Sequence, residues 1–88
     1  MAYRADNVPS FSRDGKSLYF SSNRSGVFEI WKIPITGGTA VQMTQNGGFV
    51  AFESVDGRTL YYTQTATGSS SLWRIATAGG NPEKCWTA

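Results

Sequence analysis

The chain repeats itself at a spacing of 42 residues. When the 88-residue sequence is shifted by 42 positions it aligns with itself without a gap, and ten of the 38 aligned positions from residue 9 to residue 46 are identical. A fixed period of this kind is the signature of an array of structural repeats, each burying its apolar surface against the next. The identical pairs are Ser12/Ser54, Asp14/Asp56, Gly15/Gly57, Leu18/Leu60, Tyr19/Tyr61, Gly26/Gly68, Trp31/Trp73, Ile33/Ile75, Gly37/Gly79 and Gly38/Gly80.

Each copy of the repeat predicts four short strands. The Asp-Gly pairs Asp14-Gly15 and Asp56-Gly57 supply the positive φ angles that a tight hairpin turn requires, so we interpret all four residues as structural turn residues. The strands are expected at residues 8–12, 17–22, 27–35 and 39–44, and again at 49–54, 59–64, 71–77 and 82–87. Residues 8–46 and 47–88 then form two equivalent units, and residues 1–7 form an N-terminal tail.

Several predicted strands carry apolar residues on both faces. In residues 27–35, Phe28 and Ile30 point to one side while Trp31 and Ile33 point to the other. A sheet with one face in water would alternate apolar and polar residues, so these sheets are expected to be covered on both sides. Four strands per repeat of about 40–45 residues indicate an all-β chain of two antiparallel β-propeller blades. The residues expected to pack between blades are Trp31, Trp73, Phe28, Ile33 and Tyr61.

The first copy resembles the TolB-like, WD40-like propeller repeat. That family has a Pro-x-Phe-Ser-x-Asp-Gly-Lys-x-Leu-x-Phe run, a Ser-x-Arg-x-Gly loop and an Ile-Trp strand. Here residues 9–20 read Pro-Ser-Phe-Ser-Arg-Asp-Gly-Lys-Ser-Leu-Tyr-Phe, residues 22–26 read Ser-Asn-Arg-Ser-Gly, and Ile30-Trp31 follows. The second copy departs from the pattern at residues 51–55 and at Ala66, and the Trp-Asp and His markers of true WD repeats are missing. The resemblance implies the fold and leaves the function open.

A second resemblance is to the propeller regions of bacterial multidomain regulators. It rests on the Gly37-Gly38 turn, the strand that follows it, and residues 46–48, which read Asn-Gly-Gly. The relatives suggest a periplasmic or extracytoplasmic location, and the sequence itself leaves the location of this chain open.

Two blades do not close a propeller, which takes about four or more. The two outermost apolar faces would remain bare, and repeat arrays need neighbours to cover such faces. Either the chain is a fragment of a larger propeller, or copies of it join head to tail in a closed ring. We favour the ring, which gives six blades as a trimer or eight as a tetramer, and the sequence does not choose between these.

The composition excludes several kinds of chemistry. The chain has no histidine, so Ser-His-Asp and Cys-His pairs and His-ligated metal sites cannot form within it. The net charge of +2 is spread along the chain and does not indicate nucleic acid or a membrane as a partner. Residues 1–6 lack the apolar core of a signal peptide. We expect a soluble, non-enzymatic chain without a cofactor or metal.

Candidate binding residues lie in two connections. Asn23 and Arg24 belong to the loop between the second and third strands, while Asn46 and Phe49 belong to the connection between the blades, expected on the same propeller face. Arg24 either pairs with a carboxylate of a partner or bridges to a neighbouring blade. A weaker alternative places Glu29 or Glu53 at a cation in the channel.

Two residues near the C-terminus leave alternatives open. Cys85 is expected to be a half-buried strand residue and not a reactive thiol. Trp86 either caps the core or contacts another subunit.

These features favour a non-catalytic module that assembles with itself and serves as a scaffold, or binds a protein or small ligand on one face. The chain could also be an excised or engineered propeller unit. The alternative is a fragment of a larger propeller acting as a sensory or peptidase-accessory domain. A ring that hydrolyses a lactone or sugar is disfavoured because the chain has no histidine and only 6 acidic residues.

Overall fold

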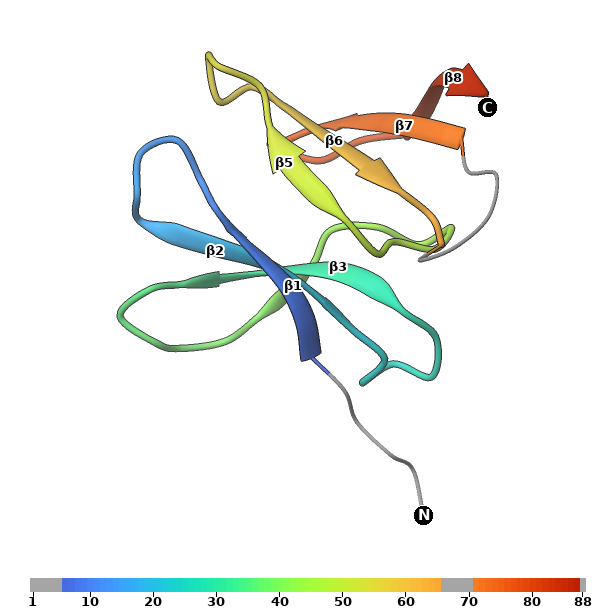
Figure 1. The fold of residues 1–88 in the computed structure, drawn as a ribbon. Helices are drawn as coiled ribbons and strands as arrows, with labels where there is room; N and C mark the ends of the chain where they lie inside the picture. Colours follow the sequence, from blue (N-terminus) through green and yellow to red (C-terminus); the bar gives the residue numbers. More distant parts are fainter. Residues whose placement is uncertain (1–5, 66–70, 88) are drawn as a thin grey trace.

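The structure is a computed structural model that describes residues 6–65 and 71–87. It contains two four-stranded antiparallel sheets, ordered β1-β2-β3-β4 and β5-β6-β7-β8, which confirms the predicted pair of blades (Figure 1). We call the first sheet blade 1 and the second blade 2. Their strands are β1 Asp6–Phe11, β2 Ser17–Ser22, β3 Glu29–Pro34, β4 Val41–Gln42, β5 Ala51–Glu53, β6 Thr59–Thr63, β7 Ser71–Ala76 and β8 Glu83–Thr87.

The first strand of each blade differs from its prediction. In blade 2 it comprises Ala51–Glu53, where residues 49–54 were expected. Strand β1 begins at Asp6, so it includes two residues assigned to the tail, and residues 1–5 of that tail lie outside the described residues. Its pairing with β2 is irregular between Asn7 and Ser10, where Val8 has a φ of 52°. A positive φ is strained for a β-branched residue, and the following Pro9 has no N–H to donate to the ladder. A β-bulge therefore interrupts the strand at this point.

The outer strand of blade 1 is shorter than predicted, and at its C-terminal end a side chain takes the place of the backbone pairing. Residues 39–44 were expected as a strand, but β4 comprises only Val41 and Gln42, followed by one further backbone bond from the Met43 N–H to the Ile30 carbonyl at 2.7 Å. The Thr44 hydroxyl accepts a hydrogen bond from the Ile30 backbone N–H at 2.9 Å and donates to Glu29. Backbone pairing stops where these side-chain bonds begin.

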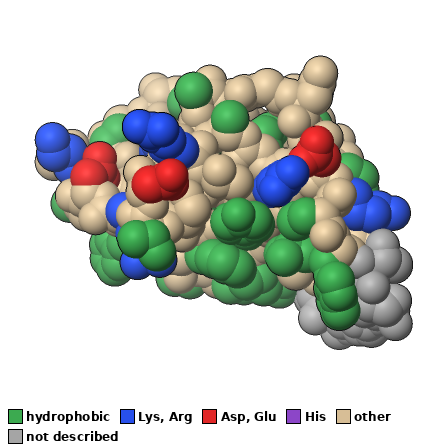
Figure 2. All heavy atoms as spheres, turned by 90° about the horizontal axis from the view of Figure 1, so that it is seen from above, with side chains coloured by type: hydrophobic (Ala, Val, Ile, Leu, Met, Phe, Trp, Pro, Cys, Tyr) green, Lys and Arg blue, Asp and Glu red, His purple; other side chains and the backbone are tan. Residues whose placement is uncertain are grey.

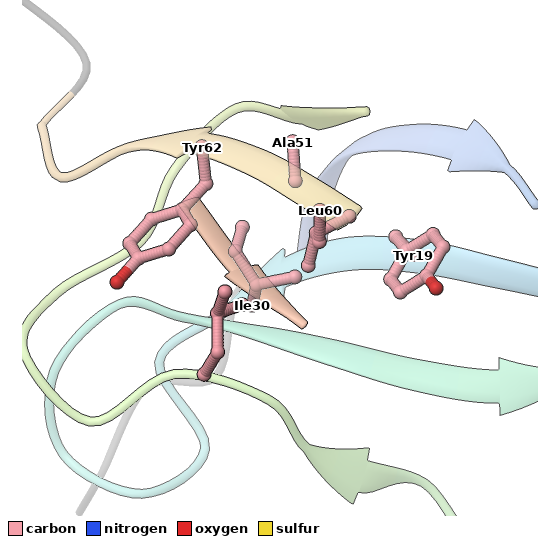
Figure 3. Packing of buried hydrophobic residues seen from close by; sticks show 6 residues of the cluster. Tyr19, Ile30, Ala51, Leu60 and Tyr62 are labelled. Carbon is pink, nitrogen blue, oxygen red and sulfur yellow. The ribbon is translucent and has the colours of Figure 1, made fainter. Parts of the chain in front are cut away.

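The core lies between the two blades. Tyr19 and Ile30 of blade 1 pack against a set of blade 2 residues (Figure 3). Met43 and Trp73 pack against this cluster. The blade 2 members are Ala51, Leu60, Tyr62 and Ile75. Since β5 lies against β1 and β2, the first strands of the two blades run close together. The blades are thus joined by one shared layer of side chains.

Alternation along the strands gives each blade an inner face, toward the other blade, and an outer face. Side chains of cross-strand partners lie on the same face of a sheet, so the strand pairing assigns each residue to the inner or the outer face. The inner faces carry Ser10, Tyr19, Ser21, Ile30 and Lys32 in blade 1 and Ala51, Glu53, Leu60, Tyr62, Trp73 and Ile75 in blade 2. The outer faces carry Pro9, Phe11, Leu18, Phe20, Trp31 and Ile33 in blade 1 and Phe52, Tyr61, Leu72, Arg74 and Trp86 in blade 2.

Candidate functional site

Arg24 lies across the outer face of blade 1. Its guanidinium carbon sits 5.0 Å from the centre of the Phe20 ring and 5.1 Å from that of Trp31, within the range of cation–π attraction. Its Nε donates to the Ser22 hydroxyl at 3.1 Å, and its Nη2 donates to the Asp6 carboxylate at 3.3 Å. The side chain is 24% exposed. It therefore belongs to the blade surface and does not extend from the loop into solvent.

Asn46 and Phe49 lie at the joint between the blades. The Asn46 side-chain oxygen accepts a hydrogen bond from the Tyr62 hydroxyl at 2.8 Å, and its backbone oxygen accepts one from the Gln64 amide at 2.6 Å. Phe49 packs edge-to-face on Phe28, with 5.5 Å between ring centres. The structure brings these residues together as a joint, while Arg24 makes its contacts on the opposite side of blade 1. The backbone carbonyl of Asn23 closes its loop by accepting a hydrogen bond from the Gly26 N–H at 2.9 Å.

Two buried carboxylates are held by hydroxyl and backbone donors. Glu29 is 2% exposed and accepts from the Thr44 hydroxyl and from the Gly47 backbone N–H at 3.1 Å. Gly48 follows directly, and a Cβ there would come within 2.7 Å of Ile30. Among the residues that the structure describes, no three His, Cys, Asp or Glu side chains gather as metal ligands would. Glu29 thus fastens the connection between the blades to β3.

Glu53 crosses from blade 2 to blade 1. One carboxylate oxygen accepts the Tyr19 hydroxyl at 2.5 Å, and the other accepts the Arg13 backbone N–H at 2.8 Å. Burial raises the pKa of the Tyr19 hydroxyl, and the bond to Glu53 raises it further. Sequence reasoning considered Glu53 only as a weak cation ligand. The sequence did contain a signal for the structural role of Glu53, because this acidic residue aligns with the apolar Phe11 of the first copy.

The predicted packing residues divide between covered and uncovered faces. Trp73 packs against the core, whereas Trp31 and Ile33 lie on the outer face of blade 1. Tyr61 lies on the outer face of blade 2, where it stacks on Phe52 with 5.7 Å between ring centres. Repeat equivalence alone could not separate Trp31 from Trp73, since only one of the two equivalent faces has a blade against it.

The two Asp-Gly turns are built alike. The Asp14 carboxylate accepts the Ser12 hydroxyl at 2.6 Å and the Lys16 N–H at 2.9 Å, and Gly15 has a φ of 71°. Asp56 accepts from Ser54 and Arg58 in the same way, with Gly57 at a φ of 73°. These bonds hold the pKa of both carboxyl groups below the ordinary value.

Cys85 was expected to be half-buried, but it is exposed, as is Trp86, because both lie on β8 at the edge of blade 2. The Cys85 thiol lies 3.2 Å from the Leu72 carbonyl oxygen, to which it donates. Trp86 pairs with Leu72 across the β7–β8 ladder and is 60% exposed. Trp86 does not cap the core that joins the two blades.

Apolar side chains are exposed on both outer faces, among them Phe11 on blade 1 and Phe52 and Trp86 on blade 2. A shallow groove on blade 1 is lined by Pro9, Leu18, Phe20, Ile33, Asp6 and Arg24. Seen from the side of blade 2, hydrophobic side chains gather along one border of the molecule (Figure 2). No described helix is long and apolar enough to cross a bilayer.

Comparison with solved structures identifies the fold. The chain superimposes on a putative TolB from Agrobacterium tumefaciens with a TM-score of 0.81 and 21% identity, covering 93% of this chain and 34% of that one. It superimposes on TolB from Acinetobacter baumannii with a TM-score of 0.75 and 19% identity, covering 99% of this chain and 22% of that one. No protein-family model and no curated protein matches the chain. The two sheets are therefore blades of a TolB-like β-propeller, and the chain spans about a third or less of the proteins it matches.

Proposed function

We propose that the chain is a non-catalytic propeller module that closes into an even-bladed ring with copies of itself and acts as a scaffold or binding domain. One observation carries the proposal. The outer face of blade 1 presents Leu18, Trp31 and Ile33, which repeat Leu60, Trp73 and Ile75 on the inner face of blade 2. That inner face buries Leu60 completely against blade 1. Blade 1 therefore offers an equivalent surface that a further blade would cover.

The carboxylates support a structural role over a catalytic one. Glu29 and Glu53 are occupied in holding the connection and the joint, and Asp14 and Asp56 are occupied in turns. A general acid or base needs a group free to exchange a proton with a substrate. The ring then functions by binding, and a protein or small ligand would be its partner on one face.

Mass in solution tests the ring. We expect light scattering to give three or four times the 9.6 kDa mass of one chain, and this value should not rise over a tenfold increase in concentration because a closed ring has no free ends to which further copies could add. A chain that stays at 9.6 kDa across this range would contradict self-assembly.

A second candidate function is favoured by the comparisons. The chain covers 34% and 22% of the two TolB structures, so it also corresponds in size to a section of a larger propeller. In that case its outer faces meet other blades of the same polypeptide, and the whole propeller acts as a sensory or peptidase-accessory domain. A monomeric mass together with exposed apolar faces would favour this candidate.

A further inference from the structure

The joint between the two blades is polar along its first strands. The Ser10 hydroxyl donates to the Ala51 carbonyl at 2.7 Å, and Glu53 accepts from Tyr19 and from the Arg13 backbone. The Arg13 guanidinium also donates to the Glu53 carbonyl at 3.4 Å. These polar groups can be buried in the joint because each one forms a hydrogen bond across it.

The same repeat positions on the outer faces are apolar. On blade 2, Phe52 stands where blade 1 has Ser10, and Val55 stands where it has Arg13. On blade 1, Phe11 stands where blade 2 has Glu53. Phe52, Val55 and Phe11 are 50%, 87% and 68% exposed. Compared with the joint inside the chain, the residues on both outer faces are changed from polar to apolar. The two outer faces therefore remain complementary to each other.

We propose that the partner of these faces is a second copy of this chain, with Pro9 and Phe11 of one copy packed against Phe52, Val55 and Tyr61 of the next. The inference rests on the proposed ring and names its contact residues. It follows from continuity with the joint already present. Tyr19 reaches Glu53 within the chain, so Tyr61, its repeat equivalent, reaches Phe11 of the neighbouring copy.

The contact is head to tail and not face to face with itself. Two outer faces of blade 1 pressed together would leave the outer face of blade 2 uncovered, with Phe52 50% exposed, whereas a head-to-tail contact covers both kinds of outer face. The outer face of blade 2 brings the aromatic pair Phe52 and Tyr61 to Phe11, and these rings gain by stacking or edge contact. A ring built this way alternates joints that are polar along their first strands, within chains, with joints that are apolar there, between chains.

The test blocks one face at a time. Phe11→Lys places an uncompensated charge in the contact on blade 1, and Phe52→Lys does the same on blade 2. Each variant alone should lose association by at least about 100-fold and run as a monomer. Mixed in equal amounts they should form a two-chain complex, because each retains the face that the other lacks. Sedimentation velocity measures all three samples.

Controls separate folding from association. Val27→Lys is matched, since Val27 is 61% exposed but belongs to the loop between β2 and β3 and to neither outer face, so its mass should equal that of the wild type. Circular dichroism should give the same β-sheet spectrum for every variant. A mixture that stays monomeric, with both spectra intact, would overturn the head-to-tail contact.

A converted joint gives an independent result. Phe11→Glu combined with Val55→Arg recreates at the contact the side chains of Glu53 and Arg13, so the double variant should still assemble. A folded double variant that is monomeric would count against the equivalence of the joints. If the wild type assembles and Phe11→Lys and Phe52→Lys leave its mass unchanged, this contact is wrong while the ring stands. If the wild type is monomeric, the ring itself is wrong.

Discussion

Glu53 shows how one residue ties two repeats together. Its carboxylate receives a hydroxyl from Tyr19 and a backbone N–H from the turn of blade 1, while only 6% of the residue remains exposed. Hydrogen bonds to a charged acceptor are about twice as strong as neutral ones. Removing one donor leaves a buried carboxylate short of a partner, which costs more than the bond itself contributes.

Tyr19→Phe should therefore lower the free energy of unfolding by about 1–3 kcal/mol. Urea unfolding at one fixed protein concentration measures the change. The matched control is Tyr61→Phe, because Tyr61 occupies the same repeat position with Phe11 and not a carboxylate as its counterpart. A control that loses as much stability as Tyr19→Phe would show that the loss does not come from Glu53.

The two turn aspartates make the stability of the folded chain depend on pH in the acidic range. The hydroxyl of Ser12, followed by the N–H of Lys16, lowers the pKa of Asp14 below its ordinary value of 3.8. A lowered pKa means that the ionised turn stabilises the folded state above that value and that this contribution is lost as the pH falls through the folded pKa.

Asp14→Asn should reduce the melting temperature at pH 7, and the difference from the wild type should close as the pH falls below the lowered pKa of Asp14, where both side chains are neutral. Differential scanning calorimetry from pH 7 to pH 2 follows the difference. Asp56→Asn should behave alike, since Ser54 and Arg58 repeat the same bonds. A difference that stays constant over this range would contradict the assignment to charge.

At the scale of the strand, the hairpins could be predicted and the ends of the blades could not. Asp-Gly pairs and alternating side chains locate β2 and β6, whose starts agree with the sequence-based ranges. The short β4 depends on Thr44 reaching Glu29 and Ile30, which lie 15 and 14 residues away. Contacts at that separation depend on how β3 and β4 are arranged and have no local sequence signal.

The two equivalent tryptophans should respond differently to truncation. Trp73→Ala opens a cavity at the core between the blades and should cost about 3–5 kcal/mol of unfolding free energy. Trp31→Ala removes a side chain from the outer face of blade 1, so it should act mainly on association. Thermal melts at two protein concentrations separate the effects. Equal, concentration-independent losses at both sites would contradict the assignment of the faces.

At the scale of the whole molecule, a single chain has the dimensions of two blades and no more. Its Cα radius of gyration is 12.4 Å and its principal extents are 38 × 35 × 20 Å. The repeat could be predicted from sequence because both copies share one pattern. The candidate contact could not, because its signal is the exchange of Glu53 and Arg13 for Phe11 and Val55, which has meaning only once the covered faces are known.

Small-angle X-ray scattering of the wild-type chain tests the central claim, that copies of this chain cover each other's outer faces in a ring. The ring predicts one particle whose radius of gyration is well above 12.4 Å and whose longest dimension exceeds 38 Å, with a pair-distance distribution typical of a disc. A distribution that matches the single chain, with a radius of gyration near 12.4 Å, would contradict it.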